Sequence, residues 1–265
     1  MNLLALDPLL SGHIDWGIVG IVVLKVVITF ALVLVAVMLM IWFERKVHAD
    51  MSNRLGPNRA GPFGILQTLA DGTKFFFKED LIPDRADRFV FRLAPFLSVV
   101  PAFLTVAVVP IGGVFTPEKG GQVELLGKQT LFQLADPPIG VLLVLACSSI
   151  AVYGVMLAGW SSGSKYPLLG SVRASAQMVS YEAALGLSVV TVVMLTGSLS
   201  THDIVMNQAG EGFLGFIPDW NVVVTGVVPF VIFIIAATAE LNRPPFDLVE
   251  AEQELVGGFH TEYSS

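Results

Sequence analysis

The residues of this sequence best suited to chemistry are carboxylates placed among apolar side chains. Glu182 lies about one turn into a long apolar run. An ionisable group in such a run costs a few kcal/mol and normally faces a bundle interior or a wet cavity. Because apolar surroundings disfavour the charged form, we expect Glu182 to gain and lose protons near neutral pH. The alternative is an acid that still lies at the level of the cytoplasmic headgroups.

A second set of acids ends the sequence, where one cation, Arg243, accompanies Glu240, Asp247, Glu250, Glu252, Glu254 and Glu262. Apolar residues such as Phe246 interleave with these acids, unlike the solvated loop that a charge run usually forms. Asp247 and Glu250 fit a capping box, and Asp247, Glu250 and Glu254 would share one face of the helix that follows. Crowded carboxylates have coupled titrations, so the cluster can store and pass protons.

A third candidate region follows the first apolar run. Glu44 closes that run, where an acid opposes the helix dipole and favours a partner from elsewhere or a protonated state. Arg54 and Arg59 lie in a stretch rich in glycine and proline, residues 54–64, which fixes a tight, irregular backbone. Arginines held in this way can orient a polar headgroup or a partner protein, although turn formation alone explains the glycines.

Composition places these residues in a membrane protein. Of 265 residues, 54% are hydrophobic and 14% are charged, whereas soluble domains carry roughly 25% charged residues. The net charge of −7 argues against nucleic acid as a partner. The single cysteine, Cys147, excludes a disulfide framework or a four-thiolate cluster from this chain alone, and we expect it to be a small apolar residue in a helix. The four histidines lack ligand spacing, so no metal site is expected.

The sequence predicts an all-α integral membrane fold, a multi-spanning helix bundle in a single membrane domain, residues 1–265. A span takes about 20 apolar residues, and we expect five, at residues 16–43, 94–114, 138–160, 179–199 and 220–239. Prolines inside these runs, Pro101, Pro110 and Pro229, predict kinks.

Charge distribution predicts the orientation of the bundle. Most of the basic residues fall in one long connection, residues 44–93, and the positive-inside rule puts that connection in the cytoplasm together with 161–178 and 240–265. The N-terminus is then outside. Within the first connection, residues 61–78 predict an amphipathic helix at the interface, with Asp71, Lys74 and Lys78 on its polar face.

Several stretches of this sequence resemble a known family. They are 44–46 (ERK), 54–64 (RLGPNRAGPFG), 69–72 (LADG), 173–182 (RASAQMVSYE), 239–247 (AELNRPPFD) and 250–264 (EAEQELVGGFHTEYS). In order, along essentially the whole chain, they are similar to the NuoH family, known in mitochondria as NADH dehydrogenase subunit 1, a membrane subunit of respiratory complex I. Members of this family continue for several helices beyond the acidic segment, so we expect a fragment or a truncated gene product.

The resemblance implies a subunit of proton-translocating NADH:quinone oxidoreductase in a bacterial inner membrane. It assigns Glu182, Glu240, Asp247, Glu250, Glu252 and Glu254 to a proton path, and Arg54, Arg59, Asp71, Glu44, Arg173 and Phe246 to the quinone cavity region. Quinone is the implied substrate, while NADH, FMN and iron–sulfur clusters would be bound by partner subunits and no cofactor by this chain. The implied partners are peripheral-arm subunits at the quinone site, membrane-arm subunits and the lipid bilayer.

Two other functions remain open from the sequence. One is the anchor subunit of a related membrane-bound hydrogenase complex, which would share the fold and the acidic segment. The other is a stand-alone ion carrier, against which stand the absence of an inverted repeat and of a matched pair of broken helices.

Overall fold

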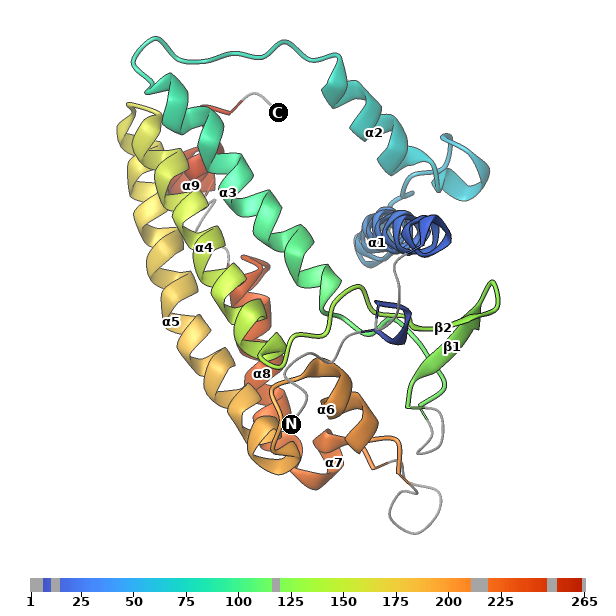
Figure 1. Cartoon of the computed structure of the whole chain (residues 1–265). Coiled ribbons are helices and arrows are strands. Elements are labelled where there is room, and N and C mark those ends of the chain that lie inside the picture. The colour runs from blue at the N-terminus through green and yellow to red at the C-terminus, as the bar shows by residue number, and fades with distance from the viewer. Residues whose placement is uncertain (1–6, 11–14, 116–119, 211–218, 247–251, 264–265) are drawn as a thin grey trace. The chain divides into compact units, whose positions relative to one another are not determined.

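The computed structural model describes residues 7–10, 15–115, 120–210, 219–246 and 252–263 (Figure 1). Four helices in this part of the chain are long and apolar enough to cross a membrane: α1 (Trp16–Met51), α3 (Arg88–Ala107), α4 (Gly140–Ser161) and α5 (Lys165–Thr196). Their outward side chains are largely exposed Val, Leu, Ile and Phe, as lipid-facing positions require. The helical membrane class is therefore confirmed, whereas four spans are found where we expected five.

The described elements form two compact units. One contains α1 and α2 (Gln67–Phe76), and the other contains all the elements from α3 onward with the short 3₁₀ helix η1 (Pro8–Leu10).

In the first unit, α1 begins at an acidic N-cap and continues beyond the predicted span. The Asp15 carboxylate accepts from the backbone N–H of Trp16 at 2.8 Å, which satisfies one of the free donors of the first turn. The helix then runs to Met51, so Glu44 and Arg45 lie within it rather than at its end.

The stretch between α1 and α2 explains why the predicted interfacial helix is shorter than residues 61–78. Residues Pro62–Gly64 form the 3₁₀ helix η2, and α2 begins only at Gln67. Gly64 has φ = 78°, and a Cβ there would lie 2.2 Å from the Pro57 carbonyl oxygen. The backbone can approach itself this closely only at glycine, so the α-helix cannot start before this turn.

In the second unit, α3 is displaced towards the N-terminus relative to the predicted span 94–114. The Asp87 carboxylate accepts from the backbone N–H groups of Phe89 and Val90 at 3.1 and 3.3 Å, which fixes the start of the helix. At the other end the Val108 carbonyl oxygen accepts from side chains of Gln133 and Thr201 instead of from a further helical turn. Pro110 consequently lies outside the helix rather than kinking it.

Helices α4 and α5 lie side by side, with α3 along the other side of α4 (Figure 1). Small residues allow this contact. A Cβ on Gly154 would lie 2.2 Å from the Ser98 hydroxyl of α3, and one on Gly159 would lie 2.4 Å from the Pro167 carbonyl of α5. Helix α5 begins at Lys165, so most of the stretch that we expected to be a connection, residues 161–178, is helical.

The predicted fifth span is broken. Its residues form α7 (Asn221–Val224) and the 14-residue α8 (Val227–Glu240), which packs on α5. Gly226 separates them with φ = 87°, a left-handed conformation that interrupts a right-handed helix. Pro229 falls in the first turn of α8, where its missing N–H costs no helical hydrogen bond.

Short elements complete the second unit. An antiparallel hairpin, β1 (Gln122–Leu125) and β2 (Lys128–Leu131), is a small exception to the all-α prediction. Helix α6 (Thr201–Asn207) follows α5, whereas α9 (Glu252–Leu255) and the 3₁₀ helix η4 (Gly258–His260) lie near the C-terminus. Phe259 packs on a buried cluster contributed by α4 and α5: Val152, Val155, Ala174 and Met178.

Candidate functional site

Two carboxyls from different helices meet hydroxyls on α4. Ser148 donates to Oε1 of Glu240, the last residue of α8, at 2.6 Å. The next residue, Ser149, donates to Oε1 of Glu182 on α5. Glu182 and Glu240 are hereafter called the carboxyl pair. Both side chains are half-buried between apolar helices.

The surroundings of Glu240 have two notable features, a buried carboxyl oxygen and the nearby charge of Glu182. Oε2 of Glu240 is buried and has no hydrogen-bond partner among the described residues. The charge of Glu182 acts on Glu240, so the two groups lie close together. Buried polar atoms without partners are uncommon in folded proteins, and this oxygen is therefore a candidate point for a proton or a water molecule.

Gln177 on α5 positions the Glu240 end of the pair. Its side-chain N–H₂ lies 3.0 Å from the Ala239 carbonyl, 3.2 Å from Oδ1 of Asn242 and 3.0 Å from the Phe246 carbonyl. An amide has two hydrogens for these three acceptors, so they share it. The side chain thus connects the end of α8 and the segment after it to α5.

Two more residues of α5 contact the C-terminal segment. The Tyr181 ring meets the Phe246 ring edge-on, with centroids 5.1 Å apart. Arg173 donates to Glu254 at 2.7 Å, and both side chains are exposed. Arg173 therefore lies on the helix that carries Glu182, and the predicted residues Phe246 and Glu254 contact that helix.

The rest of the predicted acidic cluster has no described side chains. Asp247 and Glu250, with the capping box that we predicted from them, lie outside the described residues, and Glu252 begins α9. Their grouping on one helix face stays a prediction.

In the first unit the structure brings together a different pair. Arg45 on α1 donates to Oδ2 of Asp71 on α2 at 2.5 Å, and the Gln67 amide donates to Oδ1 at 3.0 Å. The Arg45 hydrogen bond, followed by that of Gln67, holds the pKa of Asp71 below its ordinary value of 3.8. Asp71 therefore stays ionised over the physiological range.

The other residues predicted for the quinone cavity in this unit are exposed. These exposed residues are Glu44, Arg54 and Arg59. The loop that carries the arginines is attached to α1 by Lys46, which donates to Oδ1 of Asn58 at 3.1 Å. The Trp42 indole N–H donates to the Phe63 carbonyl at 3.0 Å, which attaches the same loop a second time.

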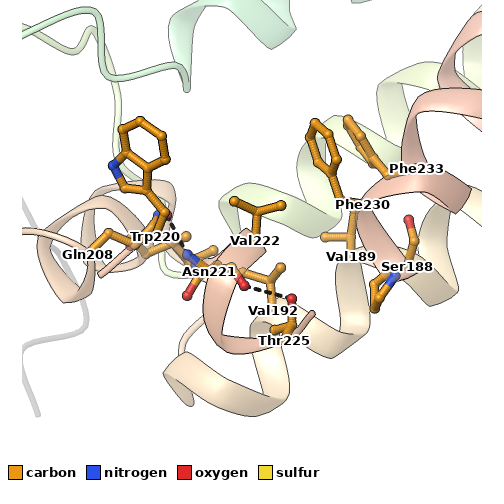
Figure 2. A pocket seen from close by; sticks show the side chains of 12 residues that line it. Ser188, Val189, Val192, Gln208, Trp220, Asn221, Val222, Thr225, Phe230 and Phe233 are labelled. Carbon is orange, nitrogen blue, oxygen red and sulfur yellow. Dashed lines mark hydrogen bonds between the residues drawn. The ribbon is translucent and has the colours of Figure 1, made fainter. Parts of the chain in front are cut away.

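A separate apolar pocket of about 580 Å³ lies among α5, α6, α7 and α8 (Figure 2). Phe230 and Phe233 of α8 line one side of it, and Trp220 lies at the other end in Figure 2. Among its polar lining groups, Thr225 donates to the Asn221 carbonyl at 2.7 Å. The described residues that line it include none of those predicted for the proton path or the quinone cavity.

The sequence interpretation missed Ser148, Ser149 and Gln177. The two serines interrupt a long apolar run, and that polar pair was a signal for a site. Gln177 lies in the stretch 173–182 that carried the family resemblance, without a role of its own. Cys147, beside the serines, is buried in α4, as predicted.

Apolar spanning helices with carboxyls held between them define a multi-spanning helical membrane protein with a polar site inside its helix assembly. A family model described as NADH dehydrogenase matches residues 24–265, and the chain belongs to that family. The resemblance noted in the sequence is thus confirmed.

Individual relatives agree with this family. The chain is 52% identical over 262 residues to NuoH of the Frankia alni NADH-quinone oxidoreductase, a match that covers 98% of this chain and 54% of the relative. It is 50% identical to NuoH of Frankia casuarinae over 98% of this chain and 54% of the relative. Identity to NuoH of Streptomyces avermitilis is 46% over 99% of this chain and 54% of the relative. The chain therefore spans about half the length of the relatives it matches.

Proposed function

We propose that this chain is a membrane subunit of a proton-translocating NADH:quinone oxidoreductase and forms part of its quinone cavity and of an acidic proton path. The carboxyl pair on the α4 serines is the observation that carries this proposal. Ionisable groups among spanning helices are expensive, and they mark ion or proton pathways by default. The relatives are named as subunits of NADH-quinone oxidoreductase, which favours this enzyme over a hydrogenase anchor or a stand-alone carrier.

In this proposal the chain moves protons and binds quinone but carries no redox centre. NADH, FMN and iron–sulfur clusters are bound by partner subunits of the peripheral arm, while membrane-arm subunits receive the proton path. Reduction of the quinone changes the charge in the cavity. The carboxyls, first Glu182 and Glu240 and then Asp247, Glu250, Glu252 and Glu254, respond by changing their protonation.

The quinone cavity region includes Glu44, Arg54, Arg59 and Asp71 from the first unit, together with Arg173 and Phe246. Arginine suits the polar head of a quinone because it presents fixed donors. The positive-inside rule puts the basic segment 44–93 on the cytoplasmic side of a bacterial inner membrane and the N-terminus outside.

The test of the proton path uses Glu182→Gln and Glu240→Gln in an assembled complex that contains this chain. An amide cannot take up and release the proton, so we expect protons moved per NADH oxidised to fall by roughly tenfold or more. Glu124→Gln, which changes an exposed acid on β1, is the matched control and should leave this ratio unchanged. Normal proton movement in both carboxyl variants would overturn the path.

The same complexes test the quinone cavity with a photoreactive quinone analogue. We expect label in residues 54–71 or near residues 240–262, and we expect free quinone to compete it away. Specific label found on other subunits alone would remove the quinone cavity from this chain and leave the proton path to be judged by the carboxyl variants.

A further inference from the structure

Two consecutive residues near the middle of α4 serve carboxyls from two different helices. Ser148 donates to Glu240 of α8 at 2.6 Å, and Ser149 donates to Glu182 of α5. Successive residues on an α-helix point about 100° apart, so neighbouring serines can face two partners at once. Cys147, which precedes the two serines, is buried in the same helix.

The hydroxyl of Ser149 has two acceptors within reach. Besides Glu182, it lies 3.1 Å from the Leu145 carbonyl oxygen of its own helix. A serine hydroxyl carries one hydrogen and can also accept. When Glu182 is ionised, the hydrogen points to the carboxylate. When Glu182 is protonated, its own O–H donates to the serine oxygen and the serine hydrogen turns to Leu145, so Ser149 bonds the carboxyl in either state and keeps its own hydrogen.

The bond of Ser148 to Glu240 leaves one carboxyl oxygen open. Oε1 accepts from the serine, whereas Oε2 is buried and has no hydrogen-bond partner among the described residues. A proton can therefore bind at Oε2 while the bond to Ser148 is kept. Because the charge of Glu182 acts on Glu240, neutralising Glu182 makes ionisation of Glu240 easier.

Three other titratable residues are close in sequence to the two serines or to the carboxyl pair. They are Cys147 on α4, Tyr181 on α5 and Arg243 just after α8. The Tyr181 ring meets Phe246 edge-on, and Cys147 is buried. The direct hydrogen bonds of the carboxyl pair come from the serines.

We propose that Ser148 and Ser149 are positioning residues that keep the Glu240 and Glu182 carboxyls hydrogen-bonded in both protonation states and so connect the two acids through α4. This inference rests on the proposed proton path. The side-chain hydrogen bonds described for the two acids come from neutral hydroxyls. A purely structural role would require the hydroxyls only for packing and would leave the pH dependence of proton movement unchanged.

The test compares Ser149→Ala and Ser148→Ala with Ser188→Ala in the assembled complex. Ser188 is a matched control because it lies on α5 and donates to the Leu185 carbonyl of its own helix. The measurement is protons moved per NADH oxidised as a function of pH. Hydrogen bonds to a charged acceptor are stronger than those to a neutral one. Loss of the hydroxyl should therefore raise the pH at which proton movement is half-maximal, by about one pH unit.

Each outcome separates the inference from the function beneath it. If the glutamine variants lose proton movement while both serine variants match Ser188→Ala, the role of the serines is wrong and the proton path stands. If the glutamine variants also behave normally, the proton path fails with it. Where Ser149→Ala does not assemble, Ser149→Thr keeps the hydroxyl and Ser149→Cys replaces it with a weak donor. Equal pH profiles for Thr and Cys would overturn the proposal.

Discussion

The chain holds its acids in two chemically different ways. In the first unit, Asp71 accepts from the Arg45 guanidinium at 2.5 Å and from the Gln67 amide at 3.0 Å. In the second unit, Glu182 and Glu240 accept from neutral serine hydroxyls. A cation stabilises the charged carboxylate alone, whereas a hydroxyl can bond either form. The comparison teaches that the partner of an acid, as much as its burial, decides whether it keeps its charge or changes it.

The geometry of the helices decides which of the two arrangements is fragile. The Arg45–Asp71 pair joins exposed side chains that can adjust to small movements. The carboxyl pair instead depends on how closely α4, α5 and α8 approach one another. Changes in helix packing should therefore damage the carboxyl pair far more than the ion pair.

The largest effect is expected for Gly159→Ala. A Cβ at this position would lie 2.3 Å from the Ser171 hydroxyl and 2.4 Å from the Pro167 carbonyl, so α4 and α5 must separate. Overpacking of this kind costs about 1–3 kcal/mol and sometimes more, and here it would also pull Ser149 from Glu182. We expect a lower unfolding temperature of the solubilised complex and impaired proton movement.

Gly20→Ala is the matched control for that change. Gly20 lies on α1, and a Cβ there would meet nothing within 4 Å. It should raise helix propensity slightly and leave both measurements unchanged. If Gly159→Ala behaved in the same way, the close approach of α4 and α5 would not be what positions the carboxyl pair.

A smaller effect is expected for Gln177→Leu. The leucine keeps the bulk of the side chain but removes the amide that donates to the carbonyls of Ala239 and Phe246. Loss of buried hydrogen bonds should cost about 1–3 kcal/mol and loosen the end of α8. The measurement is proteolysis of residues 240–246 in the assembled complex, which should become faster.

Gln67→Leu provides the comparison from the first unit. This amide donates to Asp71 across a single turn of α2, in a part-buried hydrogen bond. Because this hydrogen bond stays within the first unit, this variant should not change proteolysis at 240–246. Equal protection of that segment in wild type and Gln177→Leu would show that the amide does not position it.

Apolar runs in the sequence located much of the fold but little of the site. The start of α1 and both ends of α4 lie near those of predicted spans because length and composition suffice to define a span, whereas α1 continues to Met51, beyond the predicted end at residue 43. The rotation of α4 about its own axis cannot be predicted in this way, because the helix is apolar on all sides and has no apolar stripe that would face a partner. That Ser148 faces Glu240 and Ser149 faces Glu182 could therefore not be predicted.

The broken fifth span illustrates the same limit in the backbone. Hydropathy counts apolar residues, and residues 220–239 contain enough of them, but it does not register the left-handed conformation of Gly226. Glu182 was predicted as a candidate because charge in an apolar run is conspicuous, and Glu240 was predicted because it belongs to the acidic set near the end of the sequence. Their neutral partners were not, because a serine in a membrane helix usually bonds its own backbone, as Ser188 does.

The smallest effect is expected for the ion pair, measured by a double-mutant cycle with Arg45→Ala and Asp71→Ala. Exposed pairs contribute below about 1 kcal/mol and are screened by salt. The pKa of Asp71 is lowered in the folded chain, so its contribution is fully present above the ordinary value of 3.8 and is lost as the pH falls through the lower folded value. The coupling between the two residues should therefore be constant between about pH 5 and 8.

That constancy is what separates the two regions. Over the same pH range, proton movement through the carboxyl pair should change and should respond to the serine variants. A coupling energy between Arg45 and Asp71 that changed near neutral pH would mean that Asp71 also titrates there. A cationic partner would then not be enough to keep an acid charged in this chain, and the contrast with the hydroxyl-bonded carboxyls would lose its basis.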